Sequence, residues 1–228
     1  MNAIRVRKMI ADHTCKLLRL YGIKRMCMDD IAHELGISKR AIYKLFASKE
    51  TLVGFCLNIF SRNGRELFQQ YISRKACSPV YRSLAAVNCY IVTLYQMERI
   101  LLAELEVNTI YQPAIRRERE FWYGELLHSL EGVSFCPVIE STPSEMAENI
   151  LDLFLSNCKN GYPFTSQLWI AYLLVRGLAG SGEIAEIGEM DKVVKHEWER
   201  LSAILHNWSR PPPYKIGYGT VTDDTYSP

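Results

Sequence analysis

The stretch MDDIAHELGISKRAIYKLF, residues 28–46, contains two short amphipathic segments separated by only Gly36, Ile37 and Ser38. The apolar residues of each segment recur at the spacing of a helix face: Ile31, Ala32 and Leu35, then Ile42, Leu45 and Phe46. Gly36 can adopt the positive φ that ends a helix, and Ser38 can cap the next one. The connection is too short for an antiparallel return, so the sequence predicts a helix-turn-helix.

The outward face of the second predicted helix suits contact with DNA. In a helix-turn-helix this helix lies in the major groove, where Arg and Lys bond well to guanine edges. Its candidate contact residues are Ser38, Lys39, Arg40, Ala41, Tyr43 and Lys44. Ala41 would allow close approach, and Tyr43 would offer a hydroxyl group to a phosphate. The alternative is an ordinary tight corner between two helices of any helical protein.

Charge is divided unevenly along the chain, and this favours DNA over the plain corner. Residues 1–60 carry 11 Lys and Arg against 5 Asp and Glu, whereas residues 61–228 carry 16 against 20. A basic segment joined to an acidic one predicts that the first part contacts a polyanion and the second does not.

The sequence as a whole predicts an all-α protein. Of its 228 residues, 48% are hydrophobic, and apolar residues repeat at helical spacing in nearly every segment. Strand-like alternation is not found over any useful length. We expect a DNA-binding domain at residues 1–49, a larger helical domain at 50–208, and a Pro-rich flexible tail at 209–228. Gly22 should end the first helix, and the last should span about 190–208.

Cysteine usage and hydropathy predict a soluble, cytoplasmic protein. The 7 cysteines are scattered and never form a Cys-x-x-Cys pair, which is typical of reduced thiols rather than a zinc site or a disulfide framework. The longest apolar run, LWIAYLLV at 168–175, is too short to span a bilayer. We therefore expect no metal, no cofactor and no membrane partner.

Over about residues 5–60 the chain resembles the signature of TetR-type transcriptional regulators. The matching positions are Gly22, Met28-Asp29-Asp30-Ile31-Ala32, Leu35-Gly36-Ile37-Ser38, Ile42-Tyr43, Phe46 and Ser48-Lys49-Glu50-Thr51-Leu52. The resemblance implies base contacts from Lys39, Arg40 and Lys44, and phosphate contacts from Tyr43 and Lys49. Further contacts to the DNA backbone or minor groove could come from Arg5, Arg7 and Lys8.

Cys27 departs from this pattern, because TetR-type regulators usually have Ser or Thr just before the second helix. That hydroxyl group caps the helix and touches a phosphate. A thiol caps poorly, so the resemblance does not extend to the phosphate contact at this position.

The larger domain contains no catalytic motif, which predicts that the protein is not an enzyme. The resemblance implies a pocket for an unknown small-molecule effector between its helices. Candidate lining residues are polar and aromatic side chains beside the apolar stripes: Asn88, Tyr95, Glu104, Trp122, Tyr123 and Arg176. Any one of them could equally be an ordinary core residue.

Residues 167–178 are apolar nearly all the way round, so the helix that they form must be covered on two sides. A two-fold four-helix bundle would cover it, with interface residues Leu173, Trp198, Leu201 and Leu205. We therefore predict a homodimeric, ligand-responsive regulator. It would be a repressor that binds a palindromic double-stranded DNA operator and is released by an inducer. The alternatives are a ligand-free architectural regulator of the same fold, and an enzyme or carrier with a vestigial helix-turn-helix.

Overall fold

The computed structural model describes residues 3–73, 78–136, 139–179 and 199–203. The helices are α1 (Ala3–Arg25), α2 (Met28–Glu34), α3 (Lys39–Leu45), α4 (Lys49–Ile72), α5 (Pro79–Val107), α6 (Gln112–Leu130), α7 (Pro143–Lys159) and α8 (Phe164–Leu178). Within the described ranges the only strand-type pairing is an isolated antiparallel bridge between Phe135 and Ala179. The all-α prediction is confirmed.

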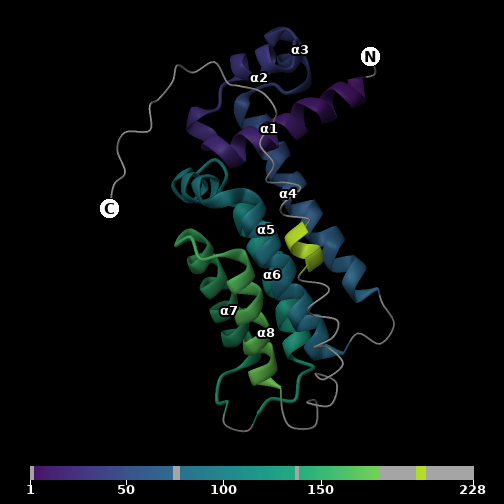
Figure 1. The fold of residues 1–228 in the computed structure, drawn as a ribbon, viewed down its shortest axis with the longest axis vertical. Helices are drawn as coiled ribbons and strands as arrows, with labels where there is room; N and C mark the ends of the chain where they lie inside the picture. The colour runs from purple at the N-terminus through teal and green to yellow at the C-terminus, as the bar shows by residue number, and fades with distance from the viewer. Residues whose placement is uncertain (1–2, 74–77, 137–138, 180–198, 204–228) are drawn as a thin grey trace.

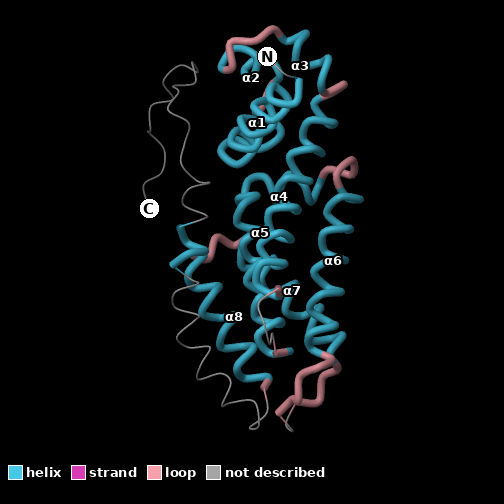
Figure 2. Tube along the Cα trace, turned by 90° about the vertical axis from the view of Figure 1, so that its right-hand side faces the viewer, coloured by secondary structure: helices cyan, strands magenta, loops and turns pink. Residues whose placement is uncertain are grey.

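The molecule is elongated, with α1, α2 and α3 at one end and α5 to α8 at the other (Figures 1 and 2). Helix α4 runs from the first group into the second and packs against both α1 and α5. Helix α5 is the centre of the larger group, because it contacts α1, α4, α6, α7 and α8 and is buried along most of its length. The predicted boundary at residue 49 therefore falls at the start of a helix that both groups share.

Local sequence accounts for several helix starts. Ser48 and Ser78 cap α4 and α5, each accepting a backbone N–H three residues ahead. Helix α7 begins at Pro143, because Thr142 and Glu145 form a reciprocal capping box before it. These caps satisfy N–H groups that the first turn of a helix leaves without partners.

Two helices differ from the sequence prediction by containing a break. Gly22 does not end α1: it adopts φ 74° and ψ −174°, and one further turn follows to Arg25. Helix α5 is interrupted at Glu98, with φ 57° and ψ 156°. Glu98 is the only non-glycine residue with positive φ in the described part of the chain. Positive φ is costly for a side chain with a Cβ, so tertiary contacts must hold Glu98 there.

Candidate nucleic-acid interface and pocket

The connection between α2 and α3 has the geometry that the sequence predicts. Gly36 adopts φ +62°, and the Ile37 N–H donates to the Ala32 carbonyl group at 3.0 Å. Ser38 Oγ accepts the Ala41 N–H at 3.2 Å, which caps α3. The predicted roles of Gly36 and Ser38 are confirmed, and α2 and α3 form a helix-turn-helix.

The inner faces of the two helices meet in a small aromatic and aliphatic core. Ile31, Ile42 and Phe46 are fully buried, and the Phe46 ring contacts Phe55 of α4 edge to face at 5.4 Å. The Arg7 guanidinium lies over both rings, 5.2 Å and 4.7 Å from their centroids. Arg7, a candidate DNA contact, is therefore engaged in covering this core.

The outer face of α3 presents the predicted contact residues to solvent. Ser38, Lys39, Arg40, Tyr43 and Lys44 are exposed, and Ala41 is half-buried beside them. Within the described part of the chain, Arg40 and Lys44 have no ion-pair partner, so both cations are available to a ligand. Lys39 differs, because its Nζ lies 2.7 Å from Asp29 Oδ2. This hydrogen bond raises the pKa of Lys39.

Two residues flank the motif, Lys49 after it and Cys27 before it. Lys49 Nζ donates to the Met26 carbonyl group at 2.6 Å, which ties the start of α4 to the connection before α2. Lys49 was predicted to contact a phosphate, and its ammonium group already has this intramolecular partner. Cys27 is the N-cap of α2, with φ −125° and no side-chain cap bond, as the sequence predicts.

A cavity of about 140 Å³ lies inside the larger domain, between α5, α6 and α7. Its wall is mostly aliphatic, with a few polar groups: Tyr90, Thr93, Leu94, Met97, Leu102, Leu105, Glu106, Gln112, Ile115, Glu118, Arg119, Leu155 and Lys159. A mostly apolar concave space with few polar groups is the usual form of a small-molecule site. None of the six residues that the sequence predicted for a pocket lines it.

The six predicted residues make contacts elsewhere in the fold. Tyr95 donates its hydroxyl to the Tyr162 carbonyl group and packs on Phe164, while the Tyr123 hydroxyl bonds Ser144 Oγ at 2.8 Å. Arg176 bonds the Tyr172 hydroxyl at 3.0 Å. Asn88 is a buried amide on α5. Trp122 is buried on α6 and donates to Glu118, which lines the cavity. Glu104 accepts a hydrogen bond from the backbone of α1.

The indole of Trp122 supports the cavity from behind. Its Nε1 donates to Glu118 Oε1 at 2.6 Å, and Arg65 Nη2 of α4 lies 2.6 Å from Glu118 Oε2. Glu118 is buried and lines the cavity, so these two donors stabilise its charge. Glu118 also borders a larger, polar hollow of about 950 Å³ between α4 and α6. Glu118 could not be singled out from the sequence, because it lies in a run of charged residues.

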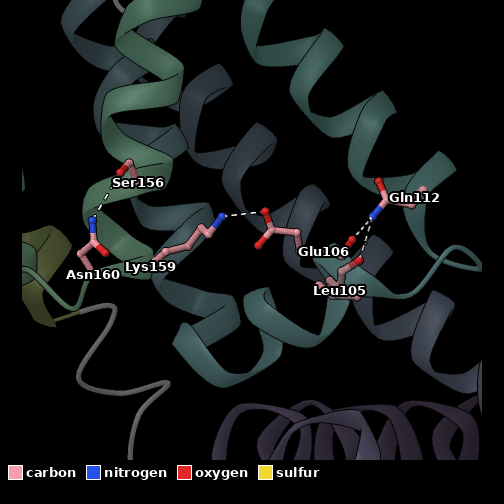
Figure 3. A network of polar contacts seen from close by, with 6 residues as sticks. All are labelled: Leu105, Glu106, Gln112, Ser156, Lys159 and Asn160. Carbon is pink, nitrogen blue, oxygen red and sulfur yellow. Dashed lines mark hydrogen bonds and ion pairs between the residues drawn. The ribbon is translucent and has the colours of Figure 1, made fainter.

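Polar contacts between helices lie at one edge of the cavity, where Glu106, Gln112 and Lys159 line it (Figure 3). Lys159 Nζ of α7 lies 2.8 Å from Glu106 Oε1 of α5. Gln112 Nε2 donates to the Leu105 and Glu106 carbonyl groups at 3.0 Å and 2.8 Å, which gives partners to two carbonyl groups in the last turn of α5. These contacts fix the end of α5 against α6 and α7.

Helix α8 carries an exposed apolar stripe on the side away from α5. Trp169 and Leu173 are 55% and 60% exposed, although Ala171, Tyr172 and Val175 of the same helix are buried. Leu201, predicted for a dimer interface, is already fully buried within this chain. That prediction needs correction: Leu201 has no surface to offer a partner. Trp198 and Leu205 lie outside the described residues.

Two further observations bear on the class of protein. No helix in the described ranges is both long and apolar enough to cross a membrane. In the same ranges, no group of three or more His, Cys, Asp or Glu side chains is placed to hold a metal ion.

Residues 10–54 match the model of the bacterial regulatory proteins of the tetR family. The fold matches CprB from Streptomyces coelicolor bound to its operator sequence, at 19% identity over 86% of this chain and 100% of that one, TM-score 0.64. It also matches KstR2 of Mycobacterium tuberculosis, a ketosteroid transcriptional regulator, at 16% identity over 76% and 94%, TM-score 0.54.

A third similar structure is AibR in complex with isovaleryl coenzyme A and operator DNA, at 20% identity over 75% of this chain and 97% of that one, TM-score 0.55. A comparison with curated proteins found no match. The resemblance to the TetR family is confirmed: residues 10–54, which contain the helix-turn-helix, match the family model, and the described fold is similar to that of TetR-family regulators.

Proposed function

We propose that this protein is a transcriptional regulator that binds a palindromic DNA operator as a homodimer and responds to a small-molecule effector. The observation that carries this function is the exposed face of α3, where Arg40 and Lys44 lie beside Tyr43 on a capped helix-turn-helix and form no ion pair with any described residue. In this motif the second helix enters the major groove, and a free guanidinium is the best reader of a guanine edge.

The exposed stripe of α8 supports the dimer. Trp169 and Leu173 present bulky apolar surface at one helical turn's spacing, and Gly177, one turn further on, has open space where a Cβ would project. A second copy packed along this stripe would cover it. The dimer would hold two α3 helices about 34–36 Å apart, the separation of successive major grooves on one side of the duplex.

The cavity between α5, α6 and α7 supports an effector site. Its volume of about 140 Å³ is close to that of an apolar cavity of roughly 150 Å³ known to hold benzene. A ring-sized apolar group would therefore fit without rearrangement. An effector of ordinary drug size needs about 300–1,000 Å³, so it would enter only if the walls moved. Such movement would link binding to a change in the dimer and hence to repression and release.

Selection of DNA fragments from a random pool by the full-length protein tests this function. We expect enrichment of a palindrome whose half-sites are about 10 base pairs apart, bound with an affinity that falls steeply as salt is raised. Recovery of random sequence alone, or of nothing above background, would contradict an operator-binding role. Sedimentation of the protein with and without the selected duplex would establish the number of copies bound.

A further inference from the structure

The cavity follows the line along which α6 and α7 pack against each other. Ile115 and Arg119 of α6 lie one helical turn apart and line it, as do Leu155 and Lys159 of α7. Arg119 contacts Asp152, which precedes Lys159 on α7 by two turns. The cavity therefore has one cation near each end, about 10 Å apart at the helical rise of 1.5 Å per residue, and an apolar wall between them.

At one end the charged groups are paired with each other. Lys159 Nζ lies 2.8 Å from Glu106 Oε1, and Gln112 Nε2 donates to the Glu106 carbonyl group beside it (Figure 3). The charge of Lys159 is thus balanced by the protein itself.

The buried carboxylate in the cavity wall also has its partners. Glu118 Oε1 accepts a hydrogen bond from Trp122 Nε1, and Glu118 Oε2 lies 2.6 Å from Arg65 Nη2. Each oxygen therefore has a donor of its own. Among the described residues that line the cavity, neither carboxylate is left unpaired for a cationic ligand.

Arg119 differs from these groups, because its contact with a carboxylate is poorly made. Its buried Nη1 lies 2.8 Å from Asp152 Oδ1, but the two are not aligned for a hydrogen bond, and no other described group accepts one from this nitrogen. The Asp152 side chain is 65% exposed, so water weakens the ion pair. A buried donor without an acceptor is unfavourable, so an acceptor that enters the cavity would be stabilised at this end.

We propose that the cavity binds a small apolar carboxylic acid in its ionised form, with the carboxylate on Arg119 and the hydrocarbon part between Ile115 and Leu155. The ligand carboxylate takes the place of Asp152, whose side chain turns into the solvent that already surrounds most of it. The guanidinium can then donate two parallel hydrogen bonds. The hydrocarbon part is a single ring or a branched chain of similar size. This inference rests on the proposed function and names the chemical class of its effector.

The first test uses three ring compounds of nearly the same shape and different charge: benzoate, benzamide and benzamidinium. Each is titrated by calorimetry into the full-length protein. Benzoate should bind on the order of tenfold more tightly than the other two, because only a carboxylate can accept two charge-assisted bonds from Arg119. Equal affinities, tighter binding of benzamidinium, or no saturable binding of benzoate in the millimolar range would each overturn the proposal.

The second test changes Arg119. Arg119→Gln should weaken benzoate binding on the order of tenfold and change benzamide binding by less than about twofold, because only the anion loses its charged partner. Arg119→Lys should lie between the wild type and Arg119→Gln, since an ammonium group keeps the charge but not the planar pair of donors.

The matched control is Arg116→Gln, an exposed arginine of α6 that does not line the cavity. It removes the same charge and should leave the binding of both compounds unchanged. If Arg119→Gln weakened benzoate and benzamide alike, Arg119 would support the shape of the cavity rather than bind the anion, and the proposal would be overturned.

The third test changes Asp152, the carboxylate that the ligand is proposed to replace. Asp152→Asn should tighten benzoate binding several-fold, because a competing anion is removed. A purely structural role of the ion pair between α6 and α7 predicts the opposite sign, since the loss of either partner would loosen the two helices. Weaker benzoate binding in Asp152→Asn would therefore overturn the proposal. Glu148→Gln, which neutralises another exposed carboxylate one turn earlier on α7, is the control and should have no effect.

A filled cavity shows where the anion binds. Leu155→Trp places a large ring in the apolar middle of the cavity and should abolish benzoate binding in a protein that still unfolds cooperatively. If this variant does not fold, Ile115→Phe replaces it. Benzoate binding equal to that of the wild type in a folded variant would place the anion outside the cavity and overturn the proposal.

The effector class and the proposed function fail in different experiments, because the titrations need no DNA. If the wild-type protein selects no palindrome but binds benzoate through Arg119, the proposed function fails and the anion site stands. If it selects a palindrome but does not distinguish benzoate from benzamide, only the effector class fails.

Discussion

The helix-turn-helix and the cavity are built from contacts of very different range. Ser38 caps α3 through an N–H three residues away, and Ile37 bonds Ala32 five residues back. The cavity brings Tyr90 of α5, Glu118 of α6 and Lys159 of α7 around one space. The first unit is specified by a short run of sequence, whereas the second exists only once three distant helices have packed.

This difference matters for function as well as for folding. The outer face of α3 keeps its shape whatever the orientation of the larger domain, because local bonds hold its residues. The cavity can change shape only by moving helices, because its walls are helix faces. A ligand-responsive regulator needs both properties: a rigid surface that contacts DNA, and an effector site whose occupation moves other helices.

The largest expected effect tests whether one helix-turn-helix binds the palindrome tightly without a second copy. Leu173→Glu places a charge in the exposed stripe of α8 without disturbing the core, since Leu173 is 60% exposed. We expect a folded monomer whose affinity for the palindrome falls by about 10²–10⁴, because linked half-site contacts lose their effective concentration. Sedimentation and DNA titration measure the two quantities.

Leu153→Glu, at an exposed position on α7, is the control and should remain dimeric. Leu201→Glu is unsuitable for this purpose: Leu201 is fully buried, so an unpaired charge there should unfold the chain rather than separate two copies. A Leu173→Glu monomer with undiminished palindrome affinity would mean that one α3 helix is enough.

The sequence could predict the local unit almost completely. Gly36, Ser38 and the apolar residues around them act through neighbours, so their spacing carries their roles. It could not predict the cavity, because which of several aromatic or polar residues on a helix faces inward depends on neighbouring helices. Glu104 shows this: a carboxylate beside an apolar stripe suggests a ligand contact, but a break at Glu98, with no sequence signal, turns it towards α1.

The next prediction concerns discrimination by the reading surface. Arg40→Ala should reduce the ratio of palindrome to random-DNA affinity by about 5- to 150-fold, since a bidentate base contact is worth about 1–3 kcal/mol. Arg116→Ala, an exposed arginine on α6, is the matched control and should leave the ratio unchanged. Competition titrations with both DNAs measure the ratio; equal losses on both would reassign Arg40 to a phosphate contact.

A smaller effect, on the free energy of unfolding, tests the close packing of α4 against α5. Gly64 of α4 touches α5 so closely that an added Cβ would lie 2.0 Å from Thr93 Oγ1 and 3.2 Å from the Trp122 ring. Gly64→Ala should lower the free energy of unfolding by about 1–2 kcal/mol, because overpacking of about 1–3 kcal/mol is partly offset by the better helix propensity of Ala. Adding Thr93→Ala should recover most of the loss in denaturant titrations. If stability did not recover, the steric clash of the added Cβ would not be with Thr93.

The smallest expected effect returns to the local unit, where one residue departs from the pattern around it. Cys27 is the N-cap of α2, its backbone is extended, and its thiol makes no cap bond. A hydroxyl at this position could accept an N–H of the first turn, so Cys27→Ser should raise the free energy of unfolding by roughly 0.5–2 kcal/mol. In TetR-type regulators a hydroxyl at this position also touches a phosphate, so the change should tighten palindrome binding as well. Cys27→Ala is the control, since it removes the thiol without adding an acceptor, and it should match the wild type in both measurements. If the Ser and Ala variants behaved alike in thermal unfolding and in DNA titration, residue 27 would not act as a side-chain cap of α2, unlike Ser38 at the start of α3.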